Sequence, residues 1–149
     1  MTNLLLQVVL SFVGTIGFSI IFNVPRKELL LCGAAGASGW LVYQIIINAA
    51  PGAAVAATLF ASMTTTYISR ILSFVRKMPS TVYMIPAVIP LVPGAGIYYT
   101  MFHAVMGDNS ESLLWGIETL RTAGLISVGL LIILSLPRQL FSIGSKNHK

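Results

Sequence analysis

The segment from Pro79 to Gly96 constrains this chain most, because it places four prolines and two glycines in an otherwise apolar run. Proline removes a backbone donor and clashes with the preceding helical turn, and glycine lets the chain leave helical geometry. Backbone broken in this way cannot face lipid, since its freed amides and carbonyls would stay unsatisfied. At membrane depth it is tolerated only inside protein or beside a wet cavity, and in transporters such a segment often binds the solute.

The rest of the chain indicates that a membrane surrounds this segment. Only 9% of the 149 residues are charged and 56% are hydrophobic, whereas about 25% of a soluble domain is charged. Long apolar runs recur from end to end, which predicts an all-α polytopic membrane protein with a single transmembrane domain over residues 1–149. The net charge of +5 comes from basic residues at the ends of apolar runs. We therefore interpret them as topology determinants and expect no nucleic-acid partner.

The apolar runs predict about five transmembrane helices. A helix needs about 20 apolar residues to cross a bilayer, and the expected spans are residues 4–22, 29–48, 53–75, 80–106 and 117–136. If the proline-rich run 80–106 crosses once as a broken fourth span, eight of the nine lysines and arginines face one side, Arg121 being the exception. Basic loops stay cytoplasmic. The prediction is therefore a multi-pass plasma-membrane protein with its N-terminus outside and its C-terminus in the cytoplasm.

Polar and small residues mark the helix faces expected to pack together. The first span carries polar residues at intervals of four, namely Gln7, Ser11, Thr15, Ser19 and Asn23. For the hydroxyls we favour hydrogen bonding between helices over a solute path. Asn23, just before Pro25, is expected either to cap the helix or to line the cytoplasmic mouth. The glycine-rich segment 33–39 predicts close helix packing. The hydroxyl face of the third span, which includes Thr65, suits packing and a solute path equally.

The candidate solute site lies where the broken span resumes. If the chain unwinds around Pro90–Gly96, the next half-helix begins inside the membrane, and its first amides at 95–97 carry the positive end of the helix dipole. Such amides bind a carboxylate without a buried cation. The residues expected to line the solute path are Asn23, Thr65, Pro90, Pro93, Gly94, Gly96, Tyr98 and Arg121.

Two further groups could move a proton or form a gate. His103 could carry a proton, although a lone histidine near the end of a span more often has a structural role. Glu118 and Arg121 are three residues apart and are neighbours on a helix. They are expected either to anchor the fifth span at the interface or to gate an external mouth.

Catalytic chemistry is not indicated. The sequence contains no Cys/His spacing suited to a metal, no phosphate-binding G-x-x-x-x-G-K-[ST] loop, and no pair of carboxylates within a span. The lone Cys32 lies in an apolar run and is expected to pack in the core. We therefore predict a protein that is not an enzyme and uses neither a metal nor another cofactor.

Two motifs resemble those of a known family. Gly17–Pro25 matches the pattern G-F-x-x-x-F-N-V-P, and Ile89–Tyr98 matches I-P-x-x-P-G-x-x-x-Y. Both are signatures of the threonine/serine exporter family, and Cys32, the glycine-rich start of the second span and residues 124–137 also resemble its short-subunit members. The similarity covers nearly the whole chain and rests on two unusual proline-containing motifs in the expected order.

This resemblance implies a function and a partner. The chain looks like the small subunit of a two-component secondary exporter that moves small carboxylate-bearing metabolites, threonine and serine, out of the cell. A dicarboxylate (succinate) exporter subunit is the alternative, and a membrane scaffold or assembly factor without solute flux is a second one. The implied partner is a larger five-span subunit with a soluble N-terminal segment. Two five-span halves would have opposite orientations, as in inverted repeats, which agrees with the N-out orientation derived from charge.

Overall fold

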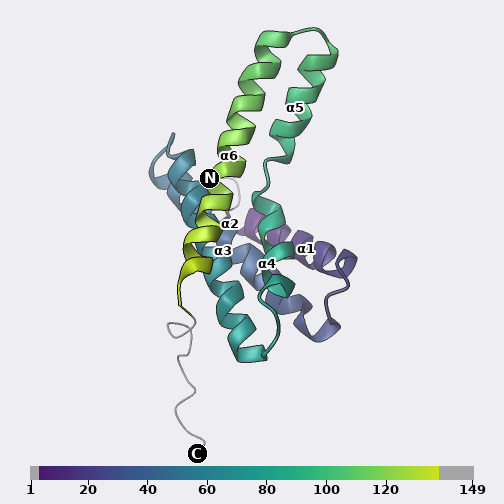
Figure 1. Ribbon diagram of the computed structural model, residues 1–149, viewed down its shortest axis with the longest axis vertical. Coiled ribbons are helices and arrows are strands. Elements are labelled where there is room, and N and C mark those ends of the chain that lie inside the picture. Colours follow the sequence, from purple (N-terminus) through teal and green to yellow (C-terminus); the bar gives the residue numbers. More distant parts are fainter. Residues whose placement is uncertain (1–3, 138–149) are drawn as a thin grey trace, which may run out of the picture.

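The computed structural model describes residues 4–137, which form helices and turns without a β-strand (Figure 1). The helices are α1 (Leu4–Ile21), α2 (Leu29–Ala49), α3 (Ala54–Arg76), α4 (Thr81–Val88), α5 (Gly94–Val105) and α6 (Asn109–Ser135). Two short 3-10 turns, η1 (Arg26–Glu28) and η2 (Ile89–Leu91), precede α2 and follow α4. The all-α prediction is confirmed for this part of the chain.

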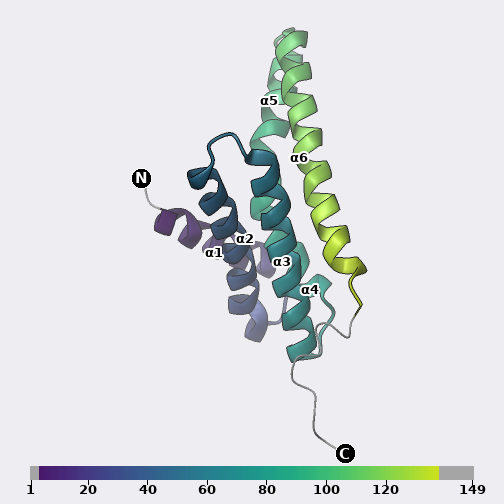
Figure 2. The ribbon, with the colours of Figure 1, turned by 90° about the vertical axis from the view of Figure 1, so that its left-hand side faces the viewer.

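Helices α1–α4 pack into a bundle, and α5 and α6 form an antiparallel hairpin that projects beyond it (Figures 1 and 2). The first half of α6 lies along α5, where the Ser112 hydroxyl donates to the Thr100 carbonyl over 2.9 Å. The second half of α6 lies along α3, because Gly129 leaves room for the Ser62 side chain. The broken segment therefore joins the bundle to the hairpin.

Three helices are long and apolar enough to cross a membrane within residues 4–137: α1, the continuous helix Arg26–Ala49, and α6. A fourth span is possible if Thr81–Leu91 and Gly94–Val105, which are bent by 51° relative to each other, count as one. Helix α3 does not reach this hydropathy, since it carries a row of buried hydroxyls. The structure thus supports three or four candidate spans, and the five-span arrangement stays a prediction.

The structure corrects the predicted start of α6 and shows how α1 ends. Helix α6 begins at Asn109, earlier than the predicted start at 117, because Asp108 caps it by accepting from the Glu111 amide over 3.3 Å. Helix α1 ends at Ile21, and Asn23, two residues later, has a left-handed backbone with a φ of 54°. The Val24 amide then donates to the Ser19 carbonyl over 3.0 Å, as in a Schellman motif. Of the two roles expected for Asn23, the structure shows the cap.

Small residues bring the helices of the bundle close together, as predicted. A Cβ atom added at Gly36 would clash with the Thr15 hydroxyl, and one at Gly39 would clash with that of Thr65. Thr15 and Thr65 are both fully buried and donate to the carbonyls four residues earlier, over 2.8 Å and 3.0 Å. These hydroxyls satisfy themselves within their own helices and pack against glycines, so helix packing accounts for them.

Substituting alanine for Gly39 tests this packing. The added methyl would clash with the Thr65 hydroxyl and lie 3.2 Å from the Ala61 carbonyl, and overpacking costs about 1–3 kcal/mol. We expect the purified protein to melt at a lower temperature, and Thr65→Ala in the same chain to restore part of the loss. Gly14→Ala is the control, because a Cβ there meets nothing. Equal melting temperatures for Gly39→Ala and Gly14→Ala would contradict the close α2–α3 contact.

Several helix ends meet at one end of the molecule (Figure 2). Arg70 on α3 donates to carbonyls at the end of α6, among them Leu134 at 3.2 Å and Leu136 at 2.9 Å. The end of α3 also meets η1, through an ion pair between Arg76 and Glu28. The basic segments at η1 and at the end of α3, which are predicted to share the cytoplasmic side, therefore lie together. The basic residues predicted for the same side at 138–149 lie outside the described residues, and the orientation in the membrane stays a prediction.

Candidate functional site

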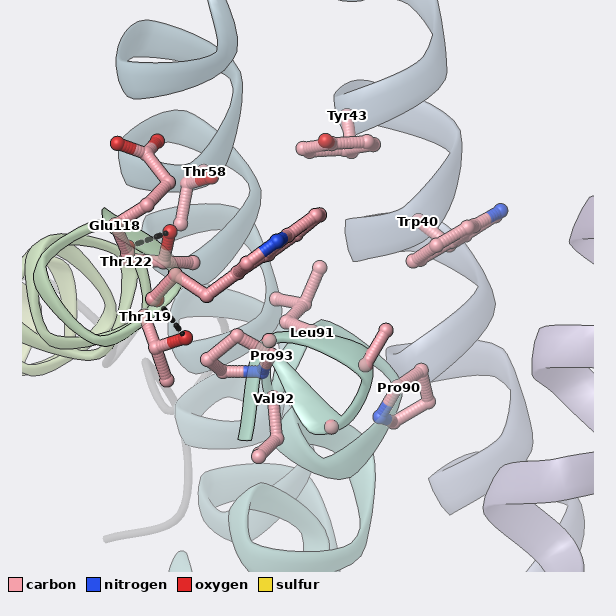
Figure 3. Close-up of a pocket in the computed structure, with 14 residues that line it drawn as sticks. Trp40, Tyr43, Thr58, Pro90, Leu91, Val92, Pro93, Glu118, Thr119 and Thr122 are labelled. Carbon is pink, nitrogen blue, oxygen red and sulfur yellow. Dashed lines mark hydrogen bonds between the residues drawn. The ribbon is translucent and has the colours of Figure 1, made fainter. Parts of the chain in front are cut away.

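A cavity of about 350 Å³ lies beside the broken segment, between the bundle and the α5–α6 hairpin (Figure 3). Residues from α2, α3, the break and α6 line it: Trp40, Tyr43, Thr58, Pro90, Leu91, Val92, Pro93, Gly94, Ala95, Gly96, Trp115, Glu118, Thr119 and Thr122. This cavity thus lies at the segment where the sequence predicts a break. We call this space the break cavity.

The break arises from the local backbone. After η2 the chain extends at Val92, where φ is −62° and ψ is 132°, and Pro93 follows with a ψ of 62°. The Val92 amide donates back to the Ile89 carbonyl over 3.0 Å, which closes the end of η2. Because proline has no amide to donate, Pro93 cannot continue the helical hydrogen-bond ladder. Helix α5 then restarts at Gly94 in a new direction.

The first turn of α5 contains amides without a hydrogen-bond acceptor and lies beside the break cavity. The Gly94 amide donates to the Val92 carbonyl over 2.8 Å, and the Ile97 amide donates to the Pro93 carbonyl over 3.1 Å. The amides of Ala95 and Gly96 belong to the first turn, where no intrahelical acceptor exists. Both residues line the cavity. Of the three amides expected as donors, at residues 95–97, only those of Ala95 and Gly96 therefore remain available. They lie at the positive end of the dipole of a twelve-residue helix.

The two glycines of the break differ in the space around them. Gly94 has a φ outside the left-handed region, and a Cβ added to it would meet nothing. Its backbone therefore does not require glycine. At Gly96, by contrast, a Cβ would clash with the Thr119 hydroxyl of α6. Gly96 is the position where the close approach of α5 and α6 excludes a side chain.

Helix α6 supplies the polar wall of the break cavity. Figure 3 shows Glu118, Thr119 and Thr122 on one side, with Trp40 and Tyr43 of α2 on the other. The Thr119 and Thr122 hydroxyls donate to carbonyls of their own helix over 2.6 Å and 2.9 Å. Glu118 therefore provides the charge on this wall, and its side chain is 56% exposed.

Thr58 on α3 adds to the cavity wall a hydroxyl that forms no hydrogen bond with the described residues. Its residue is only 5% exposed, and its side chain makes no hydrogen bond within residues 4–137. The Thr58 hydroxyl is consequently available to a ligand in the break cavity.

Aromatic rings form the apolar part of the walls. Trp40 and Tyr43 stack with their centroids 5.4 Å apart, and Trp115 lies 4.9 Å from Tyr99 in a tilted arrangement. Rings held in this way are rigid and have an apolar face. The break cavity therefore combines two amide donors, one carboxylate and an aromatic lining.

Five of the predicted site residues line the break cavity: Pro90, Pro93, Gly94, Gly96 and Glu118. The other five do not. Asn23 caps α1, Thr65 packs against Gly39, and the exposed Tyr98 ring stacks on Phe102. Arg121 lies 3.6 Å from the Glu118 carboxylate but does not reach the cavity wall.

His103 lies at the far end of α5, away from the cavity. Its Nδ1 is 3.9 Å from Oδ2 of Asp108 in the turn between α5 and α6. Hydrogen bonds from the Ser110 hydroxyl and the Glu111 amide lower the pKa of Asp108. The carboxylate that faces His103 is therefore held ionised near neutral pH, and this arrangement matches the structural role favoured for the histidine.

Sequence reasoning did not identify several cavity residues, namely Trp40, Tyr43, Trp115, Thr119 and Thr122. A signal was present for those on α6, because Trp115, Glu118 and Thr122 recur at spacings of three and four and so share one helix face. For Trp40 and Tyr43 the same spacing exists, but nothing in the sequence indicates that this face of α2 meets the break.

A second polar cluster was also missed, at the opposite end of the bundle from the hairpin. Glu28 is only 4% exposed. The guanidinium of Arg76 donates to it from Nε over 3.0 Å to each carboxylate oxygen and from Nη2 over 2.6 Å, and the Tyr83 hydroxyl donates over 2.8 Å. This cluster ties η1, α3 and α4 together. It does not line the break cavity, and its role is to stabilise the packing of these three elements.

Comparisons with known proteins agree with this picture. The family model described as "Threonine/Serine exporter, ThrE" matches residues 7–136. An uncharacterized protein of Haemophilus influenzae (strain ATCC 51907 / DSM 11121 / KW20 / Rd) is 28% identical over 105 residues, which are 70% of this chain but 35% of that protein. The chain thus spans about a third of the length of this relative. No solved structure matches. The matching family is one of transporters and not of enzymes.

Proposed function

Because the chain belongs to the threonine/serine exporter family, we propose that it is a subunit of a secondary exporter that binds serine and threonine in the break cavity. The observation that carries this proposal is the opposite polarity of two cavity walls. Free amides at the start of α5 form one wall, and the Glu118 carboxylate belongs to the other. An amino acid is a zwitterion, so each of its charged groups meets a partner of opposite sign.

The cavity suits the groups of a small amino acid. The solute carboxylate accepts hydrogen bonds from the amides of Ala95 and Gly96 at the positive end of the helix dipole. Its ammonium group donates to Glu118, and the Thr58 hydroxyl is available to either polar group. The volume of about 350 Å³ lies at the lower end of the range for small-molecule sites, about 300–1,000 Å³.

A dicarboxylate fits this cavity less well. A second carboxylate would need a cation or a second set of amides, and Arg121 is the candidate that the sequence provides. Its guanidinium faces Glu118 at 3.6 Å and does not line the cavity. Glu118 would also repel a dianion. The electrostatics therefore favour a zwitterion over succinate.

The proposal includes a larger partner subunit and the N-out, five-span orientation in the plasma membrane. About two thirds of the Haemophilus relative lies outside the matched region, which is consistent with a family architecture larger than the matched part. Glu118 is half exposed at the edge of the cavity, so a second subunit can complete the enclosure. An inverted repeat of two such halves is a common plan for secondary transporters.

Efflux from vesicles tests the function directly. The chain is reconstituted with its co-purified partner, and release of labelled serine, threonine and succinate is followed over time. We expect serine and threonine to leave faster than from protein-free vesicles, and succinate to be retained. Efflux of succinate alone would establish the dicarboxylate alternative, and an assembled complex that releases none of the three would indicate a scaffold.

A further inference from the structure

The Thr58 hydroxyl differs from every other serine and threonine hydroxyl on α3. The others all donate to backbone carbonyls; they are Ser62, Thr64, Thr65, Thr66, Ser69 and Ser73. On the α6 wall of the break cavity, Thr119 and Thr122 also donate within their own helix. Thr58 lines the same cavity, and its hydroxyl makes no hydrogen bond within residues 4–137. Of the three threonines on the cavity walls, Thr58 is therefore the one whose hydroxyl has no partner among the described residues.

The Thr58 oxygen also remains reachable. The buried side-chain nitrogen and oxygen atoms without a partner in the described part of the chain are Oε1 of Gln7 and Nε1 of Trp40. The Thr58 oxygen lacks a partner but does not belong to this set, so it retains surface that a small molecule can contact. Because only 5% of the residue is exposed and the residue lines the break cavity, that surface lies at the cavity wall.

Thr58 lies on the same side of the break cavity as Glu118 (Figure 3). Helices α3 and α6 run in the same direction (Figure 2), and Ala61 and Ile126 belong to one core cluster between them. Thr58 precedes Ala61 by about one helical turn. Thr122 precedes Ile126 by about one turn, and Glu118 precedes it by about two, each turn rising about 5.4 Å. Thr58 is therefore level with Thr122, about one turn from Glu118.

We propose that Thr58 binds the side-chain hydroxyl of the exported amino acid and so selects serine and threonine over alanine and valine. This inference rests on the proposed function, in which the solute carboxylate accepts from the amides of Ala95 and Gly96 and its ammonium donates to Glu118. Both charged groups then have partners that suit their charge. The solute hydroxyl is the polar group that remains, and Thr58 offers it a hydroxyl that can either donate or accept.

The covalent structure of the solute agrees with this assignment. In serine and threonine, the carbon that bears the hydroxyl is bonded directly to the carbon that bears the ammonium. A solute whose ammonium meets Glu118 must therefore place its hydroxyl against a neighbouring part of the wall, and Thr58 lies there. Tyr43 also brings a hydroxyl to the cavity, but from α2 on the opposite side (Figure 3). Thr58 is thus a specificity-determining residue, whereas Glu118 and the amides bind any small zwitterion.

Equilibrium binding of serine and alanine to the co-purified complex tests this role, because alanine lacks the hydroxyl and otherwise resembles serine. We expect the wild type to bind serine about fivefold more tightly than alanine, as one neutral hydrogen bond allows. Thr58→Val removes the hydroxyl at similar size and should bring that ratio close to one, with alanine binding retained. Thr58→Ser keeps the hydroxyl and should keep the preference for serine. Threonine and valine form a second pair of solutes, for which we expect the same pattern.

Two control variants locate the effect. Thr64→Val is the same substitution on α3, at a residue outside the break cavity, and should leave the serine-to-alanine ratio unchanged. Tyr43→Phe removes the hydroxyl on the opposite wall and should also leave it unchanged. If Thr58→Val prevents assembly, Thr58→Ala removes the same hydroxyl without a branched side chain, and the same ratio is measured on it.

A variant that still binds alanine is folded, so the ratio separates recognition from stability. An unchanged ratio in Thr58→Val would overturn the proposal, and so would equal weakening of serine and alanine, which would assign Thr58 to a charged group of the solute. Loss of the preference in Tyr43→Phe alone would place the solute hydroxyl on α2 instead. A wild-type complex that binds both amino acids equally would refute the role of Thr58 and leave the proposed function standing. A complex that binds neither would refute the proposed function itself, and the role of Thr58 with it.

Discussion

Substituting lysine for Glu118 is expected to abolish serine efflux and to give the assembled exporter succinate efflux. The change replaces the acceptor for the solute's ammonium with a cation on the same wall, opposite the amides of Ala95 and Gly96. The cavity would then match two carboxylates instead of one carboxylate and one ammonium. Glu118→Gln removes the charge alone and should weaken serine binding about tenfold, the lower end of the range for hydrogen bonds to charged groups.

Glu111→Lys is the matched control for this experiment. It makes the same charge change on the first turns of α6, outside the break cavity, and should leave the preference for serine over succinate intact. Both solutes are measured in the same vesicles, so a general loss of assembly affects both rates. Normal serine efflux by Glu118→Lys would show that Glu118 is not the ammonium site.

Substituting methionine for Arg76 is expected to lower the melting temperature of the protein strongly. The change leaves the Glu28 carboxylate, which is 4% exposed, without its bidentate partner, and an isolated buried charge is among the most destabilising features known. The Tyr83 hydroxyl remains as one donor, but it does not neutralise the charge. Contacts between η1, α3 and α4 should loosen first.

The double variant Glu28→Gln with Arg76→Met provides the decisive comparison. It removes both charges and keeps an acceptor for Tyr83, so we expect it to melt above the Arg76→Met single variant. Lys77→Met removes the adjacent positive charge and serves as the control, since Lys77 makes no ion pair within residues 4–137. A double variant that melts no higher than Arg76→Met alone would mean that the buried charge is not the source of the instability.

The location of the candidate site could be predicted from the sequence because covalent chemistry determines it. Pro93 has no amide hydrogen whatever surrounds it and cannot continue the helical ladder, and the first amides of a new helix have no intrahelical acceptor. Proline alone does not decide the place of the break, because Pro86 lies inside α4. The same reasoning applies to Asn23 and Pro25, where the α1 helix ends. It also applies to Gly36 and Gly39, since small residues on a helix face permit close packing in any pair of helices.

Other features depended on contacts between segments far apart in the sequence, and only the tertiary structure decided them. Glu28 is bonded to Arg76 and Tyr83, which lie 48 and 55 residues later in the sequence. No local sequence pattern predicts this pairing. Trp40 came to line the break because α2 packs beside η2, and Glu118 came to face the α5 amides because α6 folds back along α5. In the proposed function, local backbone chemistry supplies the donors for a carboxylate. Helix packing supplies the partner for the other end of the solute, because side chains on separate helices become neighbours only once those helices are docked.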